Sequence, residues 1–315
     1  MISIIVTSYT TEQLKDITEL LDSIKSQTYP DIETIFVAER SRELFTTLKA
    51  QELNVPNLRV IFNDGEAGLS AARNLGIKET RGDIVAFIDD DAVLSPNWAE
   101  ATAKAYANDG SIIGLTGPIL PLWEDQSMAW FPREFFWIFS CTYYDWTEPT
   151  EVRNGYGTNI SFRKEAFDAG GLFLTYLGSE RGSERGVQKT TAEETELSLR
   201  VKRKTGKKII YYPNVTVNHK VHTFRLTNKY IRRRAYIEGC SKMLIRKLAG
   251  DNIEGEKLLK TEYALLNRIL FRLLPSIFAG IFTHPILSWR KFSVTVVVLS
   301  SVAAGYLSYF FKKPY

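Results

Sequence analysis

The sequence predicts an α/β fold in which helices cover both faces of a mainly parallel central sheet. Short, buried apolar runs indicate strands at residues 3–7, 32–38, 58–62 and 83–88. Helical spacing of apolar residues separates these strands at residues 11–26, 44–53 and 63–82. Strands that alternate with helices in this way form parallel sheets that are covered on both sides.

Each predicted element rests on a local pattern. The first strand, SIIVT, is short, β-branched and bounded by polar residues. The following helix has its apolar residues at helical spacing and stops before Tyr29-Pro30. The third helical segment begins in a glycine-bounded turn and continues as GLSAARNLGI. The fourth strand, DIVAFI, leads directly into three consecutive aspartates.

The aspartates of FIDDDAV predict a cation site. In parallel sheets, ligands bind beyond the carboxyl ends of the strands, where Asp89 to Asp91 stand. Carboxylates two residues apart at a strand end point the same way, so Asp89 and Asp91 can share one ion while Asp90 points away. Mg²⁺ or Mn²⁺ takes such oxygen ligands and neutralises a diphosphate leaving group.

A second acidic cluster, EETE, opens a predicted helix at Glu193, Glu194 and Glu196. Carboxylates in a first helical turn stabilise the helix dipole, which would explain one of them. The functional alternative is a general base that takes a proton from an acceptor hydroxyl.

His219 and His222 follow a strand-like segment, and either could complete a metal shell, touch a phosphate or be structural. The chain shows no zinc spacing of Cys and His, no Walker lysine loop and no defensible Ser/His/Asp arrangement.

Composition and charge add a membrane hypothesis. The 315 residues are 44% hydrophobic and 24% charged, which suits one large domain with an appendage or two modest domains. Residues 200–247 hold fifteen Lys or Arg against one acid, Glu238. Such a basic segment indicates lipid headgroups, nucleic acid or a solvated helical face. Because no base-stacking module accompanies it, we expect no nucleic-acid partner and favour a membrane surface.

The C-terminal region predicts membrane attachment. Residues 292–311 are uncharged and lie between Arg290-Lys291 and Lys312-Lys313, a length that can cross a bilayer. An earlier apolar stretch, residues 273–289, is interrupted by prolines and could be a second span, a re-entrant hairpin or an interfacial helix. Residues 227–248 predict a basic amphipathic helix on the bilayer surface, with Cys240 and Leu244 among its apolar residues. The flanking charges do not settle the orientation of the span.

Four further features of the sequence add expectations. The aromatic segment 128–146 could contact a lipid acceptor, although core packing explains most of its rings better. GSERGSERG, residues 178–186, predicts a mobile loop that is either a lid or a surface excursion. With only Cys141 and Cys240, no disulfide framework is expected, and MISIIVTSY starts directly as a strand, without a visible signal peptide.

Six segments in order resemble the family 2 glycosyltransferases of GT-A fold: SIIVTSYT, GLSAARNLGI, FIDDDAV, GTNISFRKEAFDAGG, EETELSLR and YPNVTVNHKVH. The resemblance covers residues 1 to about 245. Four segments look most like a subgroup found in archaea and some bacteria: RNGYGTNISFR, SCTYYDW, EETELSLR and YIRRRAYIEGCSK. Its members include enzymes that extend sugars on dolichyl or polyprenyl phosphate, such as a glucosyl-dolichyl phosphate glucuronosyltransferase. Together with the charge and apolar patterns described above, the resemblance predicts a Rossmann-like GT-A catalytic domain over residues 1–225. A basic amphipathic helical segment at the membrane surface is expected over 226–270, and a membrane-anchoring segment of one or two hydrophobic helices over 271–315.

The resemblance also implies roles for single residues. Donor-nucleotide contacts would come from Thr7, Ser8, Tyr9, Glu39, Arg73 and Asp89. The metal ion, Mn²⁺ or Mg²⁺, would be held by Asp91 with His219, and His222 and Asp90 are less firmly implied. The pocket for donor sugar and acceptor would be shaped by Gly157, Thr158, Asn159 and Glu193.

Glu194 would be the catalytic base, at a position where many members carry Asp. The resemblance therefore implies a membrane enzyme, facing the cytoplasm, that moves one sugar from a nucleotide sugar, with UDP favoured, to a lipid-linked sugar with inversion. The absence of a Gln-x-x-Arg-Trp motif favours single addition. The alternatives are another polysaccharide or glycolipid acceptor, a nucleotidyltransferase, or a non-catalytic nucleotide-sugar-binding protein.

Overall fold

The structure is a computed structural model, and it describes residues 1–177, 190–249 and 260–310. The glycine-rich repeat at residues 178–186 lies outside the described residues.

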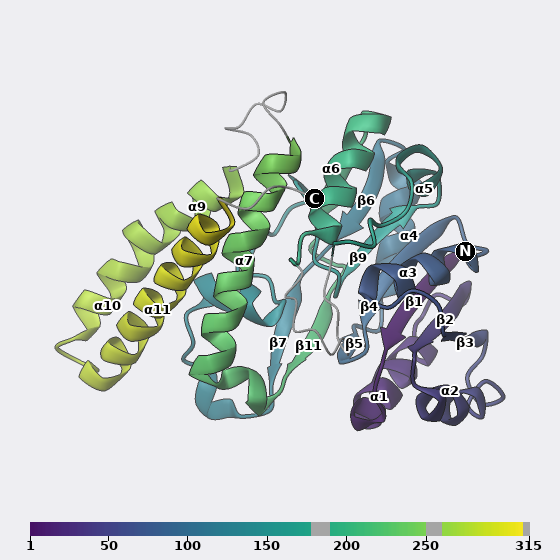
Figure 1. Ribbon diagram of the computed structural model, residues 1–315, viewed down its shortest axis with the longest axis horizontal. Helices are drawn as coiled ribbons and strands as arrows, with labels where there is room; N and C mark the ends of the chain where they lie inside the picture. Colours follow the sequence, from purple (N-terminus) through teal and green to yellow (C-terminus); the bar gives the residue numbers. More distant parts are fainter. Residues whose placement is uncertain (178–189, 250–259, 311–315) are drawn as a thin grey trace. The chain divides into compact units, whose positions relative to one another are not determined.

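An eight-stranded sheet forms the core of the first part of the chain, in the order β3-β2-β1-β4-β9-β6-β10-β8. Figure 1 labels its strands β3, β2, β1, β4, β9 and β6. Its strands are β1 (Ile2–Ser8), β2 (Ile32–Glu39), β3 (Leu58–Asn63), β4 (Ile84–Asp89), β6 (Ile112–Thr116), β8 (Thr150–Val152), β9 (Ile160–Arg163) and β10 (Lys208–Tyr211). β1 to β4 pair in parallel, and so do β6 and β10. β9 pairs antiparallel with β4 and β6, and β8 pairs antiparallel with β10. The predicted mainly parallel sheet is confirmed.

Helices cover both faces of this sheet, as predicted. Alternate residues of each strand point to opposite faces, so Ile4 and Val6 belong to one apolar cluster and Ile5 to the other. The first cluster packs against α1 (Leu14–Lys25), α2 (Arg42–Lys49) and α4 (Trp98–Asn108). The second packs against α3 (Leu69–Lys78), α5 (Glu165–Gly170) and α6 (Glu193–Thr205). A smaller sheet has the order β5-β11-β7, with β5 (Ala92–Leu94), β7 (Ile119–Trp123) and β11 (Val217–Val221).

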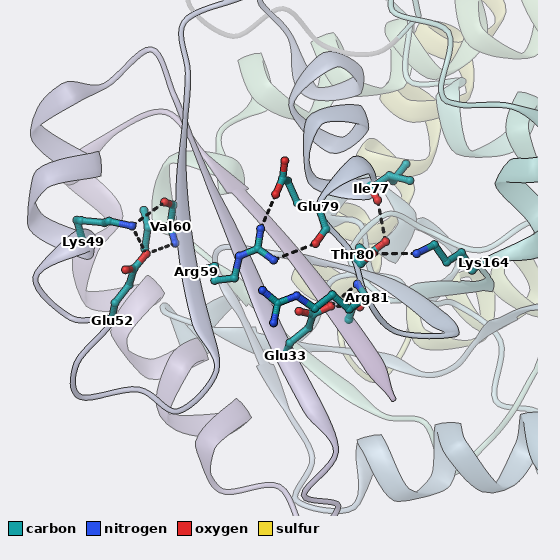
Figure 2. A network of polar contacts seen from close by, with 11 residues as sticks. Glu33, Lys49, Glu52, Arg59, Val60, Ile77, Glu79, Thr80, Arg81 and Lys164 are labelled. Atoms are coloured by element: carbon teal, nitrogen blue, oxygen red, sulfur yellow. Dashed lines mark hydrogen bonds and ion pairs between the residues drawn. The ribbon is translucent and has the colours of Figure 1, made fainter.

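A polar network near the amino ends of the strands fixes the connection from α3 to β4 (Figure 2). Glu33 Oε1 accepts hydrogen bonds from the Ser3 hydroxyl and from the Arg81 backbone N–H, both at 2.6 Å. Arg59 forms an ion pair with Glu79, and Lys164 Nζ donates to the carbonyl of Thr80 at 2.9 Å. These contacts hold α3 in place on the sheet, and α3 carries Arg73 into the site described below.

The described residues form two compact units. The first holds those within Met1–Leu120, Trp146–Lys189 and Glu193–His219, and the second those within Pro121–Asp145, Thr190–Ala192 and Lys220–Tyr315. The sequence placed its boundaries at 225 and 270, and these domain limits stay a prediction.

The second unit contains short 3₁₀ helices and a set of long helices. Its main elements are η3 (Arg133–Phe139), α7 (Asn228–Ala249), α9 (Lys260–Arg268), the π-helical turn η5 (Ile269–Leu273), α10 (Leu274–Gly280) and α11 (Pro285–Phe310). Phe131 and Phe139 of the aromatic segment are buried and pack edge to face, as core packing predicts. Among the described residues, α11 is the one helix long and apolar enough to cross a membrane.

Helices α7 and α11 pack closely against each other. A Cβ on Gly239 would meet the backbone of Val302, and a Cβ on Gly305 would meet the backbone of Tyr236. The Cys240 thiol lies 3.4 Å from the carbonyl oxygen of Gly305. The sequence predicted that Cys240 lies on the apolar side of this helix, and in the structure α11 covers that position.

Candidate active site

The carboxyl ends of three parallel strands bring the predicted donor-binding residues to one edge of the sheet. Ser8 pairs with Ala38, and Thr7 pairs with both Val37 and Asp89, so the ends of β1, β2 and β4 are level. Ser8 is buried, and its hydroxyl oxygen has no hydrogen-bond partner among the described residues. A buried hydroxyl left in this state at a strand end is suited to receive a ligand.

Asp89, Asp91 and His219 form a cluster that could hold a metal ion, with ligand atoms within 4.8 Å of one another. The Nε2 atom of His219 lies 2.9 Å from Oδ1 of Asp91, and both side chains are almost fully buried. His219 reaches this place because β11 pairs antiparallel with β5, with His219 opposite Ala92.

Asp89 and Asp91 lie together for a different reason from the one that the sequence predicted. The prediction was that both side chains lie on one face of a continuous strand. In the structure β4 ends at Asp89, and Asp90 and Asp91 form a turn before β5. The turn and the pairing with β11 therefore bring the carboxylates together. Asp90 is itself buried.

Asp89 is oriented by two neighbours. The Thr158 hydroxyl donates a hydrogen bond to Oδ2 of Asp89 at 2.5 Å. The guanidinium of Arg73 lies 3.8 Å from Oδ1. The Asp89 side chain keeps about a third of its surface exposed, 32%, so it is the open member of the cluster.

Arg73 joins the two acidic clusters. Its Nη1 donates to Glu194 Oε1 at 2.8 Å and lies 3.8 Å from Glu193 Oε1. Burial alone would lower the pKa of Arg73, but the negative charges of Glu194, Glu193 and Asp89 outweigh it and raise the pKa. Arg73 therefore stays charged although its side chain is almost fully buried.

Gly157 is required by this ion pair. A Cβ built on Gly157 would overlap both Nη2 of Arg73 and Oε1 of Glu194. The backbone at Gly157 therefore lies directly against the paired side chains, and no larger residue fits there without displacing them.

Asn159 and Glu39 support the surrounding backbone. The Asn159 amide accepts from the indole N–H of Trp98 at 3.0 Å and donates to the carbonyl of Val215 at 2.8 Å. Its side chain is buried, so any effect on a pocket would be indirect. Glu39, at the end of β2, accepts the backbone N–H of Gly68 at 2.5 Å and so anchors the start of α3.

Tyr9 and His222 are the two remaining predicted residues. Tyr9 follows β1 and is exposed. His222 belongs to the second unit, where its Nδ1 lies 3.6 Å from Glu124 Oε2 and its ring stacks on Phe224. His222 is not among the residues of the metal-type cluster.

Sequence reasoning assigned Arg73 to the donor nucleotide and missed its contact with Glu194. It also missed Trp98, which holds Asn159. A signal for Arg73 was present: a charged residue stands on the apolar, Ala-rich face of a helix packed on the sheet, and such a residue needs buried partners.

The donor atoms fit a divalent ion. Two carboxylates and an imidazole suit Mn²⁺, which accepts both oxygen and nitrogen ligands. The surrounding carboxylates outnumber the single positive charge of Arg73. An anionic diphosphate would be repelled by this excess unless a cation were bound with it.

Comparisons with known proteins show the family to which the chain belongs. Residues 3–171 match the model of glycosyl transferase family 2. A glucosyl-dolichyl phosphate glucuronosyltransferase from Haloferax volcanii is 31% identical over 245 residues, which is 78% of this chain and 77% of that protein. The chain therefore belongs to glycosyl transferase family 2 and is a glycosyltransferase.

Solved structures share the fold. The mannosyltransferase PcManGT from Pyrobaculum calidifontis, in complex with GDP-Man and Mn²⁺, has a TM-score of 0.63 at 18% identity and covers 99% of this chain and 87% of its own. Residues 1–349 of S. aureus TarS, in complex with UDP-GlcNAc, have a TM-score of 0.54 at 16% identity and cover 98% of this chain and 89% of theirs. The predicted GT-A architecture is confirmed.

Proposed function

We propose that this glycosyltransferase moves one sugar from a nucleoside diphosphate sugar, a UDP-sugar by preference, to a hydroxyl of a lipid-phosphate-linked sugar at a membrane. One observation carries the catalytic part: Arg73 contacts Glu194 on one side and Asp89 on the other, so the predicted base and the metal-type cluster share one site. The lipid-linked acceptor is supported by the similarity to the Haloferax volcanii enzyme and by helix α11.

The chemistry assigns distinct work to the residues of this chain. The Glu194 carboxylate accepts the proton of the acceptor hydroxyl, and the freed oxygen attacks the anomeric carbon of the donor sugar. The bond from that carbon to the diphosphate oxygen breaks, and its electron pair leaves with the nucleoside diphosphate. Attack opposite the leaving group inverts the configuration. An Mn²⁺ or Mg²⁺ ion held by Asp89, Asp91 and His219 would supply positive charge to the departing diphosphate.

Donor recognition belongs to the sheet edge. Thr7, Ser8 and Glu39 lie at the strand ends where a nucleotide would sit, and the buried Ser8 hydroxyl is available to it. Arg73 orients Glu194, because its Nη1 donates a hydrogen bond to Oε1 of that carboxylate at 2.8 Å.

A donor and acceptor screen tests the proposal. Purified enzyme is given UDP- and GDP-sugars with Mn²⁺, and either glucosyl-dolichyl phosphate or a soluble glucoside. We expect transfer to the lipid-linked acceptor with one group of donors. Efficient use of the soluble glucoside together with none of the lipid would refute the acceptor class.

A matched pair of variants tests the base. Glu194→Gln should reduce kcat by roughly 10³-fold or more, because a general base contributes about 10²–10⁴-fold and the ion pair with Arg73 is weakened as well. Glu196→Gln is the control, since Glu196 lies on the same helix but pairs with Arg200 at 2.7 Å. Equal losses in the two variants would remove Glu194 from its role.

A further inference from the structure

The turn between α10 and α11 exposes a group of large apolar side chains. We define residues 273–289 as the hairpin tip. Its most exposed members are Phe282 at 91%, Ile286 at 73% and Trp289 at 67%, with Phe278 and Ile281 beside them. A contiguous group of exposed apolar side chains marks a contact site, because exposing apolar surface to water is unfavourable.

Positive charge surrounds the base of this tip. Arg272 precedes it and Arg290 and Lys291 follow it, and the chain contains no Asp or Glu after Glu262. We call these three residues the basic collar. The Arg290 guanidinium lies 6.0 Å from the ring centre of Trp130. Tryptophan is typical of the membrane–water interface, and this one lies beside the basic collar. Within the part of the chain that the structure describes, no acidic side chain pairs with the basic collar, so an apolar end with this positive charge is complementary to an anionic lipid surface.

The length of the tip decides how deep it can reach. At 1.5 Å per residue, the helical path from Arg272 to Phe282 is roughly 15 Å. The hydrocarbon core of a bilayer is about 30 Å thick, so the tip matches one leaflet and not the whole membrane.

The rest of α11 makes contacts that a lipid-embedded helix would not make. Arg246 of α7 donates to the Tyr306 hydroxyl at 2.7 Å, and Lys247 donates to the carbonyl of Phe310 at 2.9 Å. Helix α7 carries eight Lys, Arg or Glu residues over Asn228–Ala249. A charged helix packed along residues 302–310 keeps that half of α11 out of a hydrocarbon core.

We propose that the hairpin tip inserts into a single leaflet of an anionic bilayer, with the basic collar at the headgroups and the second half of α11 outside the hydrocarbon. The inference rests on the membrane location in the proposed function. It replaces a transmembrane span with a hairpin inserted in one leaflet, which we call the wedge.

Depth-dependent quenching tests the insertion directly. Thr283→Cys, at the apex, is labelled with the fluorophore NBD in the full chain, and Ser300→Cys in the second half of α11 is the matched control. Both native cysteines are buried, and the unsubstituted chain reports any background labelling. The vesicles contain phosphatidylglycerol but neither donor nor acceptor, so the result does not depend on sugar transfer.

We expect the probe at 283 to be quenched more by a nitroxide deep in the acyl chain than by one on the headgroup, and to be shielded from iodide. The probe at 300 should be quenched by the headgroup nitroxide or by iodide. A probe at 283 that dithionite reaches only after the vesicles are permeabilised would show a spanning hairpin and overturn the proposal. A probe at 283 open to iodide would overturn it as well.

The basic collar has a test of its own. Arg272→Gln, Arg290→Gln and Lys291→Gln together should weaken binding to phosphatidylglycerol vesicles roughly a hundredfold, at about fivefold for each charge near an anionic surface. Binding to phosphatidylcholine vesicles should stay unchanged. Phe282→Ser, at a site too exposed to disturb the fold, should weaken binding to both kinds of vesicle. Unchanged binding in both variants would refute the wedge.

Discussion

Replacing Arg73 by methionine should cost much of the stability of the first unit. The side chain is only 4% exposed, and its guanidinium lies 2.8 Å from Glu194 and 3.8 Å from each of Glu193 and Asp89. Methionine fills similar space beside Phe87 and Phe173 but leaves three carboxylates close together without their cation. Removing one partner of a buried ion pair costs about 3–5 kcal/mol, and we expect a loss of that size.

Urea denaturation, followed by circular dichroism in the absence of divalent ions, measures the change. Arg59→Met is the matched control, because Arg59 forms an ion pair with one carboxylate, Glu79, in a partly exposed place. An exposed pair is worth about 0–1 kcal/mol, so the control should lose little. A loss below about 1 kcal/mol for Arg73→Met would refute the claim that this guanidinium holds the acidic residues together.

Kinetics of the milder Arg73→Lys variant separate two roles. If Arg73 acts through Glu194, kcat should fall while the KM for the nucleotide sugar stays within about threefold, since lysine keeps the charge but loses the planar fork. A large rise in KM with kcat unchanged would instead assign Arg73 to donor binding, as the sequence suggested.

Three further predictions follow from the site and the fold. Gly157→Ala should lower kcat about a hundredfold with little loss of secondary structure, because the added methyl group displaces the ion pair beneath it; steady-state kinetics check this. Asp91→Asn should abolish Mn²⁺-dependent transfer, as should removal of the ion with EDTA, while Asp90→Asn keeps most activity in the same assay. Glu52→Gln should cost about 1 kcal/mol at neutral pH, because Glu52 accepts from Lys49 Nζ at 2.7 Å and from the Val60 N–H at 2.5 Å. Although burial raises the pKa of Glu52, these bonds outweigh it and hold the pKa below its ordinary 4.5, so the stabilisation is present above pH 4.5 and lost as the pH falls through the lower value. Denaturation curves of the wild type and Glu52→Gln should therefore converge in acid.

The first half of the sheet was predictable because its signals are local. Residues 3–7 were expected as a strand and form β1 at Ile2–Ser8, and residues 83–88 form β4 at Ile84–Asp89. By contrast, β8 and β9 span three and four residues and join the sheet antiparallel, through partners far along the chain. No pattern within so few residues records that pairing.

The site was predictable in its parts and not in its connections. Two acidic clusters stand out in the sequence because adjacent carboxylates repel one another. The contact that links the two clusters cannot be recognised in the sequence. Arg73 and Glu194 are 121 residues apart and meet only when α3 and α6 cover the same face of the sheet. The place of His219 likewise depends on the pairing of β11 with β5.

The position of β9 has a consequence for synthesis of the protein. β4 is a buried, apolar strand. When it leaves the ribosome, the edge that pairs with β9 stays unpaired until β9 is synthesised, about 70 residues later. At 5–20 residues per second, the ribosome leaves this edge open for roughly 4 to 14 seconds. Unpaired strand edges recruit other strands, so the nascent chain passes through an interval in which it is prone to aggregate. Slower translation of residues 90–160 should lengthen that interval and lower the soluble yield.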